Sequence, residues 1–518
     1  MLLDHPMRRR DGLLALAAAL LPSLAARAGN LVDAPAGLVW PAALADEAVA
    51  LLAAAADHGL EPLDYGAETL ASRLATGPAD EALTATFERF LADLAFGRID
   101  PHTIHHEFSV APRAGFDPAA ALRAAIAHGR LADAVDAAVP PLPLYGALRR
   151  ALASMRALSG HAAWAQRLAA LPVPRRARSG KLEPGQPWPG LPALAERLAL
   201  LGDLPPGTAA PAAYEGALVE AVRGFQQRHG LETDGVLGRA TVAALEVPPA
   251  ERARQIALTM ERLRWTPLTQ GPRMIVINIP EYVLRAYEVV DGAIRVQAEM
   301  RVIVGEAMDH ETPLFDERMR SIEFSPYWNV PPSIARAETI PRLRREPGYW
   351  TRQGFEFVGA GGVDTVLTQD KLDAVRAGQL RIRQRPGPAN ALGDIKFVFP
   401  NRDHIFLHHT PTVGLFARER RDFSHGCIRV EDPVALARFA MAGMPGWDEA
   451  RIRAQMAAGT STTIPLAEPI PVLIAYGTVL VKKGRIYFYD DVYGHDARLQ
   501  AALDARRVNQ PSEEDTHR

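Results

Sequence analysis

The chain has 518 residues, of which 48% are hydrophobic and 23% are charged, and its formal net charge at pH 7 is −2. This length exceeds one ordinary domain, so we expect about two to four domains. The near-neutral charge gives no basis for binding nucleic acid or an anionic membrane. The sequence holds a single cysteine, Cys427. It cannot form an internal disulfide, so it is incidental, a metal ligand or a nucleophile.

The first 28 residues have the pattern of an export signal. Three arginines at 8–10 precede an apolar run over residues 12–24, and the segment Ala26-Arg27-Ala28 follows. This order matches the basic, apolar and cleavage regions of a signal peptide, and the arginines also fit a twin-arginine signal. We therefore expect residues 1–28 to direct export. An uncleaved signal would act as a single N-terminal anchor, although its apolar run is short for a full membrane span.

A long helical pattern follows. Over residues 29–180, apolar side chains recur at steps of three and four, with breaks such as Gly97 followed by Pro101. We predict an all-α domain here. Residues 174–190 are rich in proline, glycine and charge and read as a linker.

Residues 181–249 predict a small helical module. Leu218, Val222 and Phe225 share one helical face, and Gly230 ends that helix. The periodicity alone gives no function. The string as a whole resembles the type 1 peptidoglycan-binding domain, and it assigns a set of module residues: Phe225, Gln226, Asp234, Gly235 and Thr241.

The pattern changes to period two after a predicted connecting helix at 250–273. Residues 274–490 contain many β-branched runs, and Asp291-Gly292 predicts a hairpin turn. Further strands are expected at 365–368, 395–399, 404–409, 471–481 and 485–491. The mixed segment 326–385 is too long for a plain loop and indicates a functional insert. With a C-terminal tail at 491–518, the fold class is multidomain α+β.

Cys427 lies in the string FSHGCIRVEDP, whose residue types suit nucleophilic chemistry. A cysteine nucleophile needs a base, and the nearby histidines are His404, His408, His409 and His425. In a strand, His404 and His408 would share one face and His409 would take the other, so spacing alone does not choose the base.

Two neighbours of the thiol add to this picture. Gly426 permits a tight turn whose main-chain N–H groups could face a developing oxyanion. Arg429 would lie on the same side as Cys427 in an extended chain, where it could grip a carboxylate.

Two readings compete with a nucleophile. A zinc site could combine Cys427 with His404, His408 or His425, but one thiolate without a C-x-x-C pair is a poor structural site. An incidental buried cysteine would not explain the surrounding Gly, His, Ser and Arg residues. We therefore expect no metal site.

The stretch LHHTPTVGLFARERRDFSHGCIRVEDP resembles the signature of the YkuD-type L,D-transpeptidases. Residues 384–401 resemble the segment that precedes this signature in the large Gram-negative members. The resemblance implies a mainly-β catalytic domain with an inserted lid, and it spans nearly the whole mature chain.

The resemblance also implies roles for single residues. Cys427 would be the acylated nucleophile and His408 its base, oriented by the main-chain carbonyl of His409. The other implied residues are, around the oxyanion, Ser424, His425 and Gly426, and, at the substrate, Arg429, Tyr327, Trp328 and Asn329.

The implied activity is L,D-transpeptidation in the periplasm, in association with the cell wall. Cys427 would attack a tetrapeptide stem, and the side-chain amine of a diamino acid in a second stem would resolve the thioester into a 3→3 cross-link. No cofactor is implied, carbapenems would acylate the thiol, and cell-wall synthases stay open as partners. L,D-carboxypeptidase, D-amino acid exchange and protein anchoring would use the same thioester. A non-catalytic peptidoglycan-binding protein is the alternative from another class.

Overall fold

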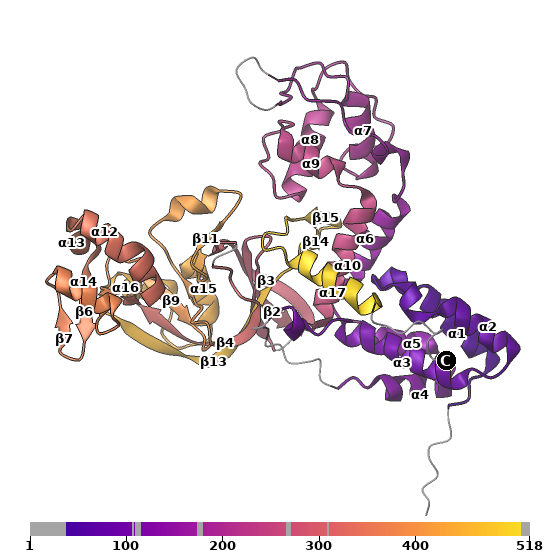
Figure 1. Cartoon of the computed structure of the whole chain (residues 1–518), viewed down its shortest axis with the longest axis horizontal. Coiled ribbons are helices and arrows are strands. Elements are labelled where there is room, and N and C mark those ends of the chain that lie inside the picture. The colour runs from indigo at the N-terminus through magenta and orange to yellow at the C-terminus, as the bar shows by residue number, and fades with distance from the viewer. Residues whose placement is uncertain are drawn as a thin grey trace, which may run out of the picture.

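The computed structural model describes residues 38–105, 108, 115–173, 180–265, 271–307 and 310–508. The predicted signal at 1–28 lies outside the described residues. Figure 1 shows an elongated molecule with a curled sheet at its centre, a helical region at one end and the insert at the other; the small helical module stands to one side. The multidomain α+β class is thus confirmed. In the part of the chain that is described, no helix is both long and apolar enough to cross a membrane.

In the N-terminal helical region, the third helix contacts the first, fourth and fifth, whereas the sixth packs on the helix at Pro249–Trp265. The helices of the region are α1 (Ala42–Ala53), α2 (Ala67–Thr76), α3 (Asp80–Phe96), α4 (Pro118–His128), α5 (Leu131–Ala138) and α6 (Pro143–Ala157). Along α3, Leu83, Phe87 and Leu91 follow one another at four-residue steps and are fully buried. This spacing places them on one helical face, which contacts α1, α4 and α5.

The small module contains α7 (Leu191–Leu200), α8 (Ala217–Arg228) and α9 (Arg239–Glu246). Val222 and Phe225 of α8 are fully buried in its core. The module also packs on the hairpin of β14 (Val479–Lys482) and β15 (Arg485–Phe488), because the ring of His229 stacks between Phe225 and Phe488.

Helix α10 (Pro249–Trp265) joins the helical region to the sheet. Its Arg264 and Glu261 form a buried ion pair at 2.8 Å. Arg264 also donates to the hydroxyl of Tyr145 on α6, and Glu261 accepts from the backbone N–H of Ile99. A buried ion pair with satisfied partners is costly to break, so these contacts fix α10 against the helical region.

The central sheet has nine strands in the order β11-β3-β12-β10-β9-β4-β13-β1-β2. The strands are β1 (Arg273–Asn278), β2 (Val283–Val290), β3 (Ala293–Gly305), β4 (Phe315–Phe324), β9 (Ile395–Val398), β10 (Leu407–His408), β11 (Asp422–Ser424), β12 (Ile428–Val430) and β13 (Thr462–Ala475). Because β3 pairs with β2 as well as with β12, the sheet closes on itself. The turn between β2 and β3 is the predicted Asp291-Gly292, with φ of 52° and 74°.

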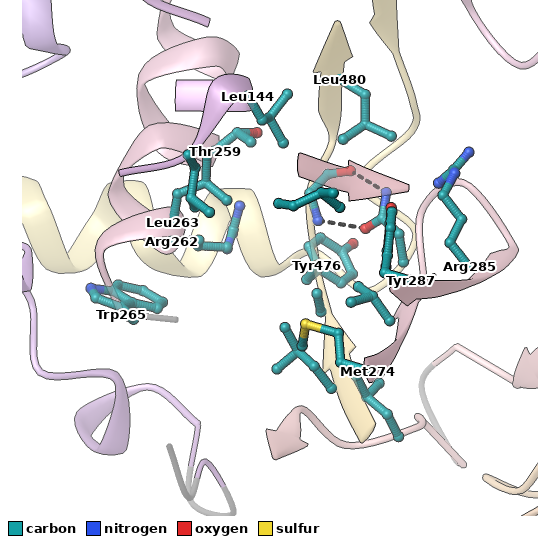
Figure 2. Close-up of a pocket in the computed structure, with 18 of the residues that line it drawn as sticks. Leu144, Thr259, Arg262, Leu263, Trp265, Met274, Arg285, Tyr287, Tyr476 and Leu480 are labelled. Atoms are coloured by element: carbon teal, nitrogen blue, oxygen red, sulfur yellow. Dashed lines mark hydrogen bonds between the residues drawn. The ribbon is translucent and has the colours of Figure 1, made fainter. Parts of the chain in front are cut away.

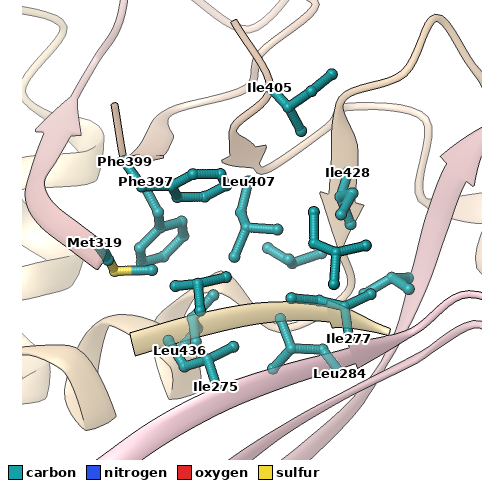
Figure 3. Close-up of a cluster of buried hydrophobic side chains, with 14 of the residues drawn as sticks. Ile275, Ile277, Leu284, Met319, Phe397, Phe399, Ile405, Leu407, Ile428 and Leu436 are labelled. Carbon is teal, nitrogen blue, oxygen red and sulfur yellow. The ribbon is translucent and has the colours of Figure 1, made fainter. Parts of the chain in front are cut away.

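The interior of the closed sheet is apolar (Figure 3). Ile275, Phe397, Leu407 and Ile428 are fully buried there, and Leu436 from α15 (Pro433–Ala440) joins them. Strand residues that alternate with these point outward, which decides the placement of the candidate site.

The C-terminal segment differs from the expected tail. Residues His495–Val508 form helix α17, and a further helix, α16 (Glu449–Ala457), lies beside α15. Leu499 and Leu503 of α17 are four residues apart and buried in the core of the sheet domain. This apolar face makes the segment a packed helix instead of a tail.

The insert between β4 and β9 is a small body with its own core. Its elements are β5 (Trp328–Asn329), α11 (Pro332–Ile334), a π-helical turn η5 (Ala335–Thr339), α12 (Ile340–Arg345), α13 (Gly348–Gln353), β6 (Phe355–Gly359), β7 (Gly362–Asp364), α14 (Gln369–Arg376) and β8 (Arg381–Gln384). Leu343, Trp350 and Phe357 are buried within it. The strand predicted at 365–368 is wrong, because Thr368 caps α14 by accepting from the N–H of Lys371.

Candidate active site

Four side chains form a row across the outer face of the sheet. Glu323 of β4 is paired with Lys396 of β9, Lys396 with His408 of β10, and His408 with Arg429 of β12. Directly paired residues point to the same face, and their strand neighbours Ile322, Phe397, Leu407 and Ile428 fill the interior. The row therefore places one acid, two cations and one imidazole side by side.

Cys427 immediately precedes β12 and is partly buried. Its Sγ lies 3.7 Å from the carbonyl oxygen of His404, to which the thiol donates. Burial raises the pKa of the thiol to about 11, while the charges of Lys396 and Arg429 act in the opposite direction. The resting thiol is therefore neutral at pH 7, and its proton has to leave when it attacks.

His408 is the imidazole of this row, on the strand beside Arg429. Its ring is 4% exposed, and Nδ1 lies 2.5 Å from the carbonyl oxygen of His409. Donation from Nδ1 leaves the lone pair on Nε2, which is the arrangement of a general base. Burial and the charge of Arg429 lower the pKa of His408 to about 3, so the imidazole is neutral at pH 7. Since the thiol donates to His404 at rest, transfer to His408 requires the thiol to change partner.

The expected strand over 404–409 is shorter than predicted. Only Leu407 and His408 belong to β10, and His404 lies in a turn with φ of 57°. The prediction that His404 and His408 share a strand face is therefore wrong, because Asn401 holds this turn by bonding to both backbone groups of Ile405.

The turn that carries Cys427, the proposed nucleophile, is held by one of its own side chains. Ser424 Oγ donates to the carbonyl oxygen of Cys427 at 2.5 Å and accepts from the N–H of Gly426 at 3.2 Å. Gly426 has φ of 105°, and a Cβ there would meet Ile405 Cδ1 at 3.2 Å. Of the main-chain N–H groups of this turn, that of Gly426 is thus engaged by Ser424.

Thr312 supports this turn and gave no signal in the sequence. Its hydroxyl donates to the carbonyl oxygen of Gly426 at 2.7 Å and accepts from the N–H of Gly305 at 2.8 Å. The hydroxyl of Tyr493 in turn donates to the carbonyl oxygen of Gly305. These residues are far apart in the chain, so only the fold shows that they bond to one another.

His425 connects the nucleophile turn to the insert. Its Nε2 lies 2.6 Å from Oε1 of Glu338 in the π-helical turn, and its ring lies edge-on to that of His310. His425 thus contacts the insert, as a supporting residue, and does not contact His408.

Arg429 carries a positive charge that no carboxylate among the described residues pairs with. Within the described residues its Nε is buried and has no hydrogen-bond partner. A half-buried cation with unmet hydrogen-bonding capacity on the same face as Cys427 suits a carboxylate ligand.

The other predicted residues surround the site less closely. His409 bonds through Nδ1 to Asp394 at 2.7 Å, in addition to presenting its carbonyl to His408. At the entrance to the insert, the Tyr327 ring lies under Arg383 at 4.1 Å. Trp328 is half-buried against the insert core, and Asn329 is exposed.

The predicted residues of the small module mainly hold its fold. Gln226 is 2% exposed, and its amide donates to Asp234 at 2.9 Å and to Thr241 at 3.3 Å. Its Oε1 accepts from the N–H of Gly235. Phe225 is fully buried, so of these five residues only Asp234 is exposed.

An apolar cavity lies elsewhere in the described structure. It has a volume of about 340 Å³ and lies between α10 and strands β1 and β2 (Figure 2). Leu263, Trp265, Met274 and Tyr287 line it. None of the candidate catalytic residues does, so it plays no part in the site. Among the described residues, no three His, Cys, Asp or Glu side chains gather as metal ligands.

Models of known protein families match three parts of the chain. Residues 272–452 match the family model of the L,D-transpeptidase catalytic domain, YkuD. The chain carries a YkuD-type L,D-transpeptidase domain. Residues 37–152 match the scaffold domain, and residues 189–245 match the "Putative peptidoglycan binding domain". The matched catalytic range contains both the row on the sheet and the nucleophile turn.

A curated protein of Haemophilus influenzae, named "Putative L,D-transpeptidase", is 31% identical over 272 residues. The match covers 51% of this chain and 54% of that protein, so it spans about half the length of each. Among solved structures, an L,D-transpeptidase of Stackebrandtia nassauensis is 13% identical, with a TM-score of 0.22, over 57% of this chain and 94% of that one. An L,D-transpeptidase structure of Xylanimonas cellulosilytica is 17% identical, with a TM-score of 0.18. The match covers 58% of this chain and 100% of that one. These scores add no argument to the family models.

Proposed function

We propose that this YkuD-type protein is a cysteine L,D-transpeptidase that forms 3→3 cross-links in peptidoglycan. The observation that carries the proposal is the pairing of β10 with β12. It puts His408 directly beside Arg429. Cys427 lies two residues before Arg429 in the chain, on the same face of the sheet. The hydrogen bond from His408 Nδ1 to the His409 carbonyl leaves Nε2 as the base.

The first half of the reaction forms a thioester. The S–H bond of Cys427 breaks, its proton passes to Nε2 of His408, and sulfur attacks the carbonyl carbon of residue three in a tetrapeptide stem. The C–N bond to the terminal D-Ala then breaks, and His408 returns the proton to the leaving amine. Because both groups are neutral at rest, proton transfer accompanies the attack.

The second half transfers the acyl group. The side-chain amine of a diamino acid in a neighbouring stem attacks the thioester, and the C–S bond breaks. A new C–N bond forms, His408 accepts the proton of the amine and passes it to the sulfur, and the thiol of Cys427 is restored. No cofactor enters either half. Arg429, whose Nε is buried and unpaired in the described structure, binds a carboxylate of the donor stem.

The remaining parts have supporting roles. The insert, with Tyr327, Trp328 and Asn329 at its start, covers the donor stem. The module at 181–249 binds peptidoglycan, and the N-terminal signal places the enzyme in the periplasm at the cell wall. Carbapenems acylate Cys427, because the thiolate opens their four-membered amide.

Product analysis tests the proposal. The mature chain is incubated with disaccharide-tetrapeptides, and the products are separated and sequenced by tandem mass spectrometry. Cross-linked dimers with a 3→3 bond, absent with Cys427→Ala, support the proposal. Tripeptides without dimers would instead indicate a carboxypeptidase. Unchanged substrate with retained binding to sacculi would indicate a non-catalytic binding protein.

A further inference from the structure

Lys396 lies in the candidate site but has no role in the mechanism above. It stands on β9, directly opposite His408 on one side and Glu323 on the other. Its side chain therefore emerges on the outer face that also carries Cys427. Its position could not be recognised from the sequence, because a lysine in a strand is usually a solvated surface residue.

The ammonium of Lys396 reaches toward the level of the thiol. Nζ lies 4.3 Å from the ring centroid of Phe406. Leu407 is paired with Ile428, so Phe406, one residue earlier, is level with Cys427. The backbone agrees, because the N–H of Ile428 donates to the carbonyl oxygen of Phe406 at 3.1 Å. The backbone of Lys396 is thus level with His408, whereas its ammonium lies over Phe406, the residue level with Cys427.

The charge of Lys396 is only partly balanced. Its carboxylate partner, Glu323, lies 3.5 Å away, and both side chains are 20% exposed. In a partly buried setting a charge acts over a longer distance than in water. Lys396 and Arg429 are the two cations whose charges oppose the effect of burial on Cys427.

We propose that Lys396 stabilises the negative charge that develops on the sulfur of Cys427 while its proton passes to His408. The inference deepens the proposed function and rests on it. As the S–H bond breaks, the electron pair stays on sulfur until the C–S bond forms, and the ammonium of Lys396 faces that charge. Phe406 and Glu323 hold the ammonium in place, so Glu323 weakens its effect while orienting it.

Alkylation of the thiol tests this directly. Cys427 is the only cysteine in the chain, so every carbamidomethyl group added by iodoacetamide reports on it. The rate is measured on the mature chain between pH 7 and 10. For Lys396→Met we expect the pH–rate line to move about one unit toward alkaline pH, which is about a tenfold slower reaction at a given pH. Lys396→Arg keeps the charge and restores most of the rate.

For a second variant we expect the alkylation rate to change in the opposite direction. Glu323→Gln removes the balancing carboxylate and leaves Lys396 in place, so alkylation becomes faster at every pH. The matched control is Lys371→Met in the insert. Lys371 has the same kinds of contact, a carboxylate at 2.6 Å in Asp364 and a ring centroid at 5.8 Å in Phe357. We expect this control to leave the line unmoved.

The outcomes separate this inference from the proposed function. If Lys396→Met and Glu323→Gln both fold and their pH–rate lines coincide with that of the wild type, the inference is overturned. This holds even when the wild type makes cross-links. If Lys396→Met does not fold, the direction of the Glu323→Gln shift decides. A wild type without cross-linking activity overturns the proposed function, whereas the alkylation shift is read independently of any peptide substrate.

Discussion

Nε2 of His425 lies 2.6 Å from Oε1 of Glu338, and this contact joins the turn that carries Cys427 to the π-helical turn of the insert. The two residues are 87 positions apart in the chain. π-Helical turns are rare and are frequent at functional sites. The contact therefore marks where the insert meets the nucleophile turn.

Breaking this contact should weaken binding of the donor stem more than it slows the chemical step. Both side chains are partly exposed, so the pair contributes about 0.2–1 kcal/mol to keeping the insert in place. For Glu338→Gln and His425→Gln we expect KM for the donor to rise about two- to fivefold, with kcat little changed. Glu346→Gln is the matched control, since its ion pairs with Arg342 and Arg352 lie within the insert. A fall in kcat with constant KM would contradict this role.

Gly426→Ala should abolish most activity. Its φ of 105° suits only glycine, and the added Cβ would press on Ile405 at 3.2 Å, displacing the nucleophile turn. We expect at least about a tenfold loss of acylation and a stability cost of about 1–3 kcal/mol. Gly443→Ala is the control, because Gly443 has φ of 83° but no atom near its Cβ position. It should lose stability and keep activity, as denaturant melts and acylation rates would show. Equal activity loss in both variants would refute a specific role for the turn.

Thr312→Val should damage the site without touching the substrate. The valine removes the hydroxyl that bridges Gly305 N–H and the Gly426 carbonyl, leaving two buried backbone groups unpaired. We expect a loss of about 1–3 kcal/mol for each unpaired group, together with slower acylation. Thr312→Ser keeps the hydroxyl and should recover most of both. Denaturant unfolding and acylation rates measure the two effects, and equal damage from serine and valine would argue against the bridge.

The pH dependence of the free thiol follows from its surroundings. Burial raises the pKa of Cys427 to about 11, so its thiolate fraction is small at pH 7 and grows as pH rises. We expect alkylation of the wild type by iodoacetamide to climb about tenfold per pH unit from 7 to 10 without a plateau. The low pKa of His408, about 3, means that the base stays neutral throughout this range. A rate that levels off between pH 9 and 10 would show a thiol with an ordinary pKa.

Local sequence was sufficient to predict the residues that one motif contains. Cys427, Ser424 and Gly426 lie in a single turn, and the resemblance assigned His408 and the carbonyl of His409, which the structure joins by a hydrogen bond. Spacing alone left four histidines open as the base, and the strand expected to hold two of them is only two residues long.

Residues brought in by the fold could not be predicted in this way. Thr312, Glu338 and Lys396 reach the site from a loop, the insert and a neighbouring strand, and each looks like an ordinary surface residue in the sequence. In the small module, the resemblance assigned Gln226 and Thr241 to the peptidoglycan-binding motif. They are buried and bond to each other, because a polar motif can hold a turn as well as a ligand.

The central claim is that Cys427 becomes acylated with His408 as its base. Intact-protein mass spectrometry of the mature chain with a carbapenem tests it, alongside Cys427→Ala, His408→Ala and the control His404→Asn, which retains a side chain that tolerates positive φ. The account predicts one adduct on the wild type, none on Cys427→Ala, slower formation on His408→Ala and an unchanged rate on His404→Asn. A folded wild type that forms no adduct, or an adduct that survives Cys427→Ala, would contradict it.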